Sequence, residues 1–225
     1  MSPTAPHRVE SAALPYLLSL PRGPAPASGA WPLLCFLHGY DEGAPLPIGE
    51  ALTRHGPLAP TAAPEATAEF VVLAPQLPAR GDLWLRYAAV VRELVLQVQA
   101  LHPADPARAF LTGFSYGGNG VFDLALAQPG LWAALWPVDP TRVPRADPRL
   151  PVWLSSGEIS RHAAQSFTRR LGLAPPRGAV PGDRIYRDDG QDHVGTARLA
   201  YADERIYRWL LARRPPAPGA DARRA

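Results

Sequence analysis

The sequence predicts an α/β fold in which a mostly parallel sheet of about seven or eight strands is flanked by helices on both faces. Short apolar runs bounded by Pro and Gly recur along the chain, and segments with helical spacing separate them. The 225 residues are 47% hydrophobic and 19% charged, which is typical of one soluble globular domain with a shared core. In such a fold, ligands bind at the carboxyl ends of the strands.

Seven apolar runs are the expected strands. They are YLLSL at 16–20, PLLCFLHG at 32–39, FVVLAP at 70–75, AFLTG at 109–113, WAALWPV at 132–138, PVWLSS at 151–156 and RIYRD at 184–188. Near-continuous apolar strands are typical of a parallel sheet that is covered on both faces. Cys35, the only cysteine, lies in the second run, so it cannot form an internal disulfide and is expected to be buried rather than reactive.

Three segments are expected to be helical: 85–101, 117–127 and 199–212. In the first, apolar residues recur at i, i+3, i+4, i+7 and i+10 and therefore share one face. These residues are Val91, Leu94, Val95, Val98 and Leu101. Helices that alternate with strands indicate right-handed crossovers between parallel strands.

The chain is expected to consist of a flexible N-terminal arm (1–13), one folded domain (14–212) and a disordered basic tail (213–225). No apolar run approaches the roughly 20 residues that span a membrane, and the apolar part of the N-terminus is short and interrupted by Pro15. We therefore expect a cytoplasmic protein. All 23 basic residues are Arg and are scattered, which argues against nucleic-acid binding.

Residues 113–117 read Gly-Phe-Ser-Tyr-Gly and match the G-x-S-x-G pattern of a nucleophilic serine. The context supports the match, because an expected strand precedes Ser115 and an expected helix follows it. Glycines suit such a sharp turn, where the helix packs too closely on the strand to admit a Cβ. The alternative interpretation is a structural serine in a glycine-rich turn.

His193 is the expected base for this serine. It follows the last expected strand, which agrees with the chain order serine, acid, histidine that one group of hydrolases uses. His38 directly follows a buried strand and is expected to orient a loop whose backbone amides face the nucleophile. The other histidines are interpreted as surface or terminal residues: His7, His55, His102 and His162.

Two backbone amides are the candidate oxyanion hole. One belongs to Tyr116, the residue after the serine, and the other to Tyr40 in the loop that begins His38-Gly39. His38 and Gly39 are also candidate pocket residues, together with Trp84 on a loop near the expected cleft. The other tryptophans are better explained as core or sheet-flanking residues.

Several stretches together resemble the poly(3-hydroxybutyrate) depolymerase-like and "predicted peptidase" carboxylesterases of the α/β-hydrolase superfamily. The stretches are WPLLCFLHG, TRHGP, FVVLAPQLP, FLTGFSYGGNGVFDLA, PVW and YADERIYRWLLARR, and the resemblance covers roughly residues 14 to 212. It implies an α/β-hydrolase fold with Ser115 as nucleophile and His193 as catalytic histidine.

The sequence departs from this family at the acid. Relatives carry His-Gly-x-x-Asp after the strand that here reads PVWLSS, and this chain has Ser160 at the Asp position. Glu158 is the nearest carboxylate and the first candidate, because a triad also works with Glu. Asp139, at the end of the preceding strand, is the alternative. Asp189 and Asp192 are close to His193 in sequence, but so local a pair seldom has suitable geometry.

The leading hypothesis is therefore a serine hydrolase that cleaves a small carboxylic ester, with no cofactor and no metal site. Only DPTRVPRADPRL separates the strands at 132–138 and 151–156, which leaves no room for a cap domain and implies an open site. A thioesterase or peptidase would use the same machinery. The departure at Ser160 motivates an alternative from another class, a catalytically impaired hydrolase-fold protein that binds a ligand.

Overall fold

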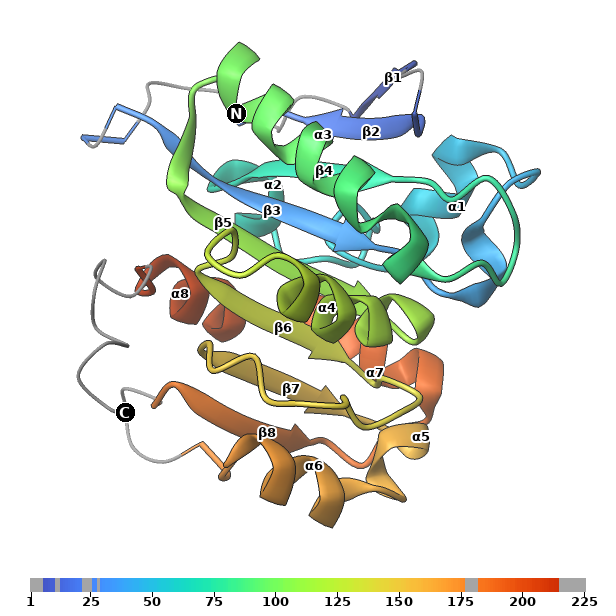
Figure 1. Cartoon of the computed structure of the whole chain (residues 1–225), viewed down its shortest axis with the longest axis vertical. Helices are drawn as coiled ribbons and strands as arrows, with labels where there is room; N and C mark the ends of the chain where they lie inside the picture. Colours follow the sequence, from blue (N-terminus) through green and yellow to red (C-terminus); the bar gives the residue numbers. More distant parts are fainter. Residues whose placement is uncertain (1–5, 11–12, 22–25, 28, 177–181, 215–225) are drawn as a thin grey trace.

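The computed structural model describes residues 6–10, 13–21, 26–27, 29–176 and 182–214, and these residues contain one eight-stranded sheet (Figure 1). The strands are β1 (His7–Val9), β2 (Tyr16–Ser19), β3 (Trp31–Leu37), β4 (Val71–Pro75), β5 (Ala104–Phe114), β6 (Ala134–Val138), β7 (Val152–Ser156) and β8 (Arg184–Asp188). Their order across the sheet is β1-β2-β4-β3-β5-β6-β7-β8. The pairs from β4 to β8 are parallel, and β1 and β2 are antiparallel.

All seven predicted strands are confirmed. The eighth, β1, lies in the predicted N-terminal arm and pairs with β2, so these three residues belong to the sheet. The pattern gave no sign of β1, because it is only three residues long and largely exposed. Residues 215–225 of the predicted tail lie outside the described residues.

Helices cover both faces of the sheet. They are α1 (Ile48–Arg54), α2 (Glu65–Ala68), α3 (Ala88–Leu101), α4 (Tyr116–Ala127), α5 (Glu158–Arg161), α6 (Ala164–Leu171), α7 (His193–Ala202) and α8 (Glu204–Leu211), with 3-10 turns η1 (Tyr40–Glu42) and η2 (Trp84–Tyr87). One apolar cluster joins α3, α4 and α6 to the face nearer the viewer in Figure 1. A second joins α1, α2, α7 and α8 to the opposite face.

Two helix predictions need correction. The segment 199–212 is not one helix but the end of α7 followed by α8, because the chain breaks at Asp203, whose carboxylate caps α8 by accepting from the Arg205 N–H. Leu101, the last residue of α3, is 68% exposed, whereas the other four predicted face residues are buried.

The remaining core predictions are confirmed. Cys35 is fully buried in β3, and burial raises the pKa of its thiol. The tryptophans Trp132, Trp136, Trp153 and Trp209 are also buried.

The connection between β6 and β7 (139–151) contains neither helix nor strand, as predicted, so no cap covers the sheet edge there. The loop is tied to α4, because the Asn119 side-chain carbonyl accepts from the Thr141 and Arg142 amides. Within the described ranges, no helix has both the length and the apolar character that a membrane crossing requires.

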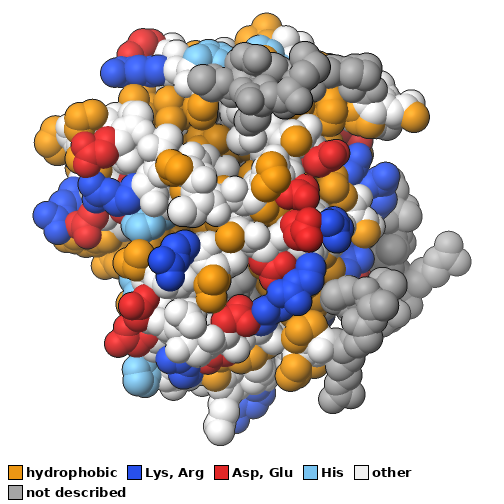
Figure 2. Space-filling model, turned by 180° about the vertical axis from the view of Figure 1, so that it is seen from behind, with side chains coloured by type: hydrophobic (Ala, Val, Ile, Leu, Met, Phe, Trp, Pro, Cys, Tyr) orange, Lys and Arg blue, Asp and Glu red, His pale blue; other side chains and the backbone are white. Residues whose placement is uncertain are grey.

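Charges of both signs are mixed on the surface. Figure 2 shows basic and acidic side chains interspersed on the face opposite to that of Figure 1. Exposed ion pairs in the described residues include Arg208 with Glu204 and Arg54 with Glu50. This face therefore carries no single-sign patch.

Candidate active site

Ser115 occupies a strained turn between β5 and α4. Its φ of 58° and ψ of −116° lie in a region that residues with a side chain seldom adopt. The Ser115 amide donates to the Val138 carbonyl (3.0 Å), which ties the turn to the end of the neighbouring strand β6. Ser115 is therefore held at the carboxyl edge of the sheet, in the conformation expected of a nucleophile elbow.

The glycines of the motif are required by close packing. A Cβ on Gly117 would collide with the Leu37 carbonyl of β3, and a Cβ on Gly113 would collide with the Gly117 backbone. The helix therefore starts directly against the strands, which is the physical reason for the pattern around Ser115.

His193 is the first residue of α7, and Asp192 caps that helix by accepting from the Gly195 amide (2.6 Å). The His193 ring packs on the ring of Phe114, the residue before Ser115, with ring centroids 4.5 Å apart. Its Nδ1 lies 2.6 Å from Oδ2 of Asp139. The structure thus brings the predicted histidine next to the predicted serine turn and gives it a carboxylate partner.

The Asp139 carboxylate is completely buried at the end of β6, in a residue with a φ of 40°. Burial would raise its pKa, but hydrogen bonds from His193, the Ser160 hydroxyl and the Ser160 amide outweigh that cost, so the pKa of Asp139 lies below its ordinary value. A second oxygen, Oδ1, also accepts from the Gly157 amide (3.0 Å). The group is therefore an ionised, fully satisfied carboxylate.

The carboxylate that contacts His193 is that of Asp139, the alternative acid, and not that of Glu158, the first candidate from the sequence. Glu158 begins α5 with an exposed side chain. The start of α5 turns its backbone amides toward Asp139, with Ser160 N–H at 2.8 Å and Ile159 N–H at 3.4 Å from the carboxylate oxygens. The place of Asp139 at the end of a strand made it the alternative in the sequence, but the choice between the two acids depends on the pairing of β6 with β5 and β7.

The other nearby acids have local partners. Asp189 accepts from Arg187, and Asp192 caps α7. Neither has a recorded bond to His193 within the described part of the chain.

His38 directly follows β3, and both nitrogens of its ring are hydrogen-bonded to backbone groups. Its ring is buried, Nδ1 donates to the Gly39 carbonyl (2.7 Å) and Nε2 accepts from the Leu77 amide (3.0 Å). Burial lowers its pKa to about 4, so the ring is neutral and can accept at Nε2 while it donates at Nδ1. His38 thereby ties the start of the loop between β3 and η1 to the segment that follows β4.

Trp84, a candidate pocket residue in the sequence, has the contacts of a packing residue. It is buried, its Nε1 donates to the His38 carbonyl (3.0 Å), and its ring meets the His38 ring edge-on at 4.9 Å. A Cβ on Gly120 of α4 would collide with its side chain. Trp84 therefore packs against His38 and stabilises the loop that follows β3.

The loop after His38 lies against the nucleophile. A Cβ on Gly39 would lie 3.5 Å from the Ser115 Cβ and 2.8 Å from the Glu42 carboxylate. Glu42 is buried, and burial raises its pKa despite hydrogen bonds from the Gly39 and Glu42 amides. Because Glu42 takes the Gly39 amide, the next amide in the chain, that of Tyr40, remains the better candidate to face a ligand.

His55 was missed by the sequence interpretation, which assigned it to the surface. Its ring meets Phe114 edge-on at 4.9 Å, its Nε2 lies 3.8 Å from Glu42, and burial lowers its pKa to about 4. It also lines a small pocket of about 190 Å³ with Val194 and Tyr201. His55 lies in the TRHGP stretch of the resemblance, but its position beside Phe114 depends on the fold.

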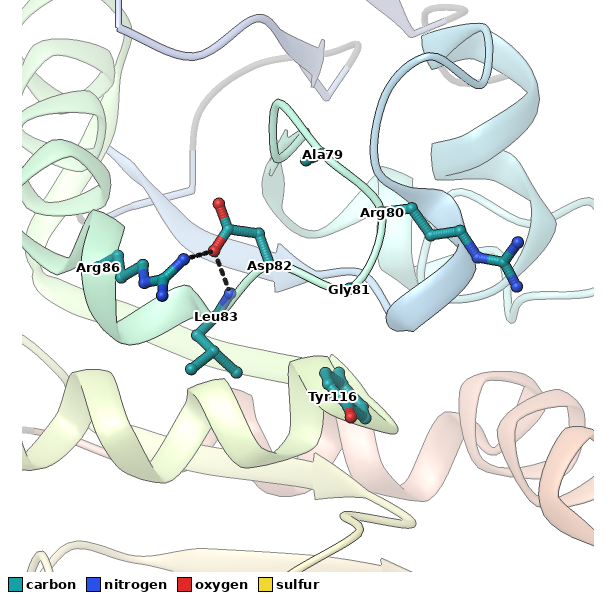
Figure 3. A pocket seen from close by; sticks show the side chains of 7 residues that line it. All are labelled: Ala79, Arg80, Gly81, Asp82, Leu83, Arg86 and Tyr116. Carbon is teal, nitrogen blue, oxygen red and sulfur yellow. Dashed lines mark hydrogen bonds and ion pairs between the residues drawn. The ribbon is translucent and has the colours of Figure 1, made fainter.

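A larger open cleft lies beside the start of α4. It has a volume of about 450 Å³ and is lined by Ala79, Arg80, Gly81, Asp82, Leu83, Arg86 and Tyr116 (Figure 3). Arg86 pairs with Asp82 inside the cleft, and Arg80 points away from it. The ring of Tyr40 meets that of Tyr116 edge-on at 5.0 Å. The cleft thus reaches Tyr116, one of the two residues whose amides are the oxyanion candidates, and the ring of the other packs against it.

The described residues contain no group of three or more His, Cys, Asp or Glu side chains arranged to hold a metal ion.

No family model and no curated protein matches the chain. Solved structures do. A thermostable esterase superimposes with a TM-score of 0.69 at 19% identity, over 93% of this chain and 62% of that one. FphF, a fluorophosphonate-binding serine hydrolase of Staphylococcus aureus, superimposes with a TM-score of 0.64 at 16% identity, over 94% of this chain and 98% of that one. An S-formylglutathione hydrolase from Agrobacterium tumefaciens superimposes with a TM-score of 0.62 at 12% identity, over 94% of this chain and 99% of that one.

The chain has the α/β-hydrolase fold. This confirms the fold expected from the resemblance, and the strand order and the elbow at Ser115 agree with it. The chain spans 62% of the thermostable esterase but nearly all of the two other hydrolases.

Proposed function

We propose that the protein is a serine hydrolase that cleaves carboxylic esters through an acyl-serine intermediate. The observation that carries the proposal is the 2.6 Å contact between Asp139 and His193, whose ring packs on Phe114 directly before the strained Ser115. These contacts support a triad in which Asp139 is the acid, His193 the base and Ser115 the nucleophile.

Each residue of the triad has a defined task. The ionised Asp139 accepts the Nδ1 proton of His193 and so leaves Nε2 free to act as a base. Ser115 Oγ attacks the acyl carbon as its proton passes to His193, which then protonates the leaving alcohol as the acyl–oxygen bond breaks. Water, activated by His193, hydrolyses the acyl-serine and restores the enzyme.

The amides of Tyr40 and Tyr116 are proposed to stabilise the tetrahedral oxyanion. Both residues begin a helical turn, η1 and α4, so neither amide has an acceptor within its own helix. The Gly39 Cα lies against Ser115, which brings the Tyr40 loop to the same side as the nucleophile.

The substrate is proposed to enter through the open cleft beside Tyr116. Tyr116, whose ring packs against that of Tyr40, gives the cleft an aromatic wall, whereas Asp82 and Arg86 make its rim polar. The absence of a cap between β6 and β7 favours a small, accessible ester, which is the substrate and partner expected from the sequence. We further propose that the protein acts in the cytoplasm.

A catalytically impaired binding protein was the alternative from another class, and its basis was the loss of a carboxylate at Ser160. Asp139 supplies a carboxylate to His193 from another strand, so that argument no longer favours impairment.

The test is hydrolysis of p-nitrophenyl acetate and butyrate by the wild type and by Ser115→Ala. The proposal expects turnover by the wild type and background by the variant, and parallel assays on a thioester and a peptide substrate rank the bond cleaved. Wild-type turnover no faster than that of Ser115→Ala on every substrate would refute the proposal.

A further inference from the structure

The two oxygens of the Asp139 carboxylate have separate partners. Oδ2 faces His193, and Oδ1 accepts from the Ser160 hydroxyl at 2.6 Å as well as from the Ser160 and Gly157 amides at 2.8 and 3.0 Å. The Ser160 hydroxyl is thus the shortest of the three contacts at Oδ1, and Ser160 itself is 1% exposed.

The Ser160 hydroxyl is itself part of a chain of hydrogen bonds across three strands. Ser156 Oγ, at the end of β7, lies 2.8 Å from Ser160 Oγ. The Tyr186 hydroxyl on β8 donates to Ser156 Oγ at 2.9 Å. The chain therefore runs from Tyr186 through Ser156 and Ser160 to Asp139 on β6.

The direction of this chain is fixed by proton counting. An ionised carboxylate can only accept, so the single Ser160 proton must point at Asp139. Ser160 Oγ must then accept from Ser156, and Ser156 Oγ from Tyr186, which leaves every hydroxyl proton in use. A hydroxyl with one allowed orientation is a rigid donor, and a hydrogen bond to a charged acceptor is the stronger kind.

We propose that Ser160 is a positioning residue of the active site: its hydroxyl, oriented by Ser156 and Tyr186, holds the Asp139 carboxylate so that Oδ2 stays on His193. This inference rests on the proposed serine hydrolase function. Ser160 acts through Asp139 and touches neither His193 nor the substrate. The hydroxyl chain explains how an acid at the end of β6 is held in place from β7 and β8.

The experiment compares Ser160→Ala with Ser155→Ala. Ser155, next to Ser156 on β7, is the matched control. Its buried hydroxyl accepts from Trp136 Nε1, and only its backbone carbonyl, which the substitution keeps, accepts from the Asp139 amide. For each variant, kcat and KM for p-nitrophenyl butyrate are measured across pH, with the active-site concentration titrated by a fluorophosphonate.

For Ser160→Ala we expect kcat to fall roughly 10- to 100-fold, the size of one hydrogen bond to a charged group, with KM within about threefold. The acid limb of the pH profile should move to higher pH, because an Asp139 carboxylate with one donor fewer binds a proton more readily. Tyr186→Phe should shift the profile the same way by less, and Ser155→Ala should not shift it.

A further arm repeats Ser160→Ala in the Asp139→Asn background, where kcat should change by less than about twofold because both residues act on one function. Wild-type kcat in Ser160→Ala, an unshifted acid limb, or a full additional loss in the Asp139→Asn background would each overturn the inference. Failure of the proposed function looks different, since the wild type itself would then lack turnover.

Discussion

Exchange of the Asp139 carboxylate for an amide, in Asp139→Asn, removes the negative charge while keeping the shape of the side chain. The outcome follows from the two oxygen environments. Three donors point at Oδ1, namely the Gly157 amide, the Ser160 amide and the Ser160 hydroxyl. Oδ2 has His193 Nδ1 at 2.6 Å and, at a longer 3.4 Å, the Ile159 amide. The amide oxygen therefore takes the Oδ1 position, and the amide NH2 group faces His193.

An NH2 group at that position can only donate, so His193 Nδ1 must accept and its proton moves to Nε2. That tautomer cannot take the proton of Ser115. We expect kcat to fall roughly a thousand- to ten-thousand-fold, the cost of holding a triad histidine in the wrong tautomer.

The assay is p-nitrophenyl butyrate hydrolysis at several pH values, with Glu158→Gln as the matched carboxylate-to-amide control. Glu158→Gln should stay within about twofold of the wild type, because its side chain is exposed. A loss of less than tenfold in Asp139→Asn, or a larger loss in Glu158→Gln, would refute the assignment of the acid.

Three further predictions concern the scaffold. Gly117→Ala should lower the free energy of unfolding in urea by about 1–3 kcal/mol, because the new Cβ would collide with the Leu37 carbonyl. The control Gly49→Ala places its Cβ in open space on α1 and should not destabilise the fold. Equal stability of the two variants would contradict the packing argument. Because burial lowers the pKa of His38 and His55 to about 4, the unfolded state binds protons that the folded state refuses, so stability should fall from about pH 6.5 towards pH 4. His38 alone should cost about 2 kcal/mol between pH 7 and 5, and a His38→Gln variant with an unchanged pH slope would contradict this. Trp84→Phe removes the indole donor of the buried His38 carbonyl and should lower the free energy of unfolding by about 1–3 kcal/mol. The control Trp31→Phe, at the half-buried start of β3, should lower it by less. A larger loss in Trp31→Phe than in Trp84→Phe would contradict this explanation.

The sequence predicted the fold well because the decisive signals are local. Apolar runs of strand length and the glycines around Ser115 depend on neighbours a few residues away, and the seven predicted strands are all present. The break at Asp203 was missed because a capping aspartate inside a periodic apolar pattern does not interrupt that pattern.

The site was predictable only in part, because its partners come from separate strands. Ser115 and His193 follow from chain order, but the acid depends on which carboxylate the sheet brings to His193. Glu158 was favoured for its place after β7, yet its side chain turns outward at the start of α5, and Asp139 reaches His193 from β6. Trp84, a candidate pocket residue, instead packs under His38, and His55, interpreted as a surface residue, lies beside Phe114; both positions depend on contacts between distant segments.

The most direct test of the proposed chemistry is intact-mass analysis after reaction with a fluorophosphonate, followed by peptide mapping. The account predicts one phosphonyl group per chain, bound in the peptide that contains Ser115, and no adduct in Ser115→Ala. A wild-type protein that remains unmodified, or an adduct that persists in Ser115→Ala, would contradict it.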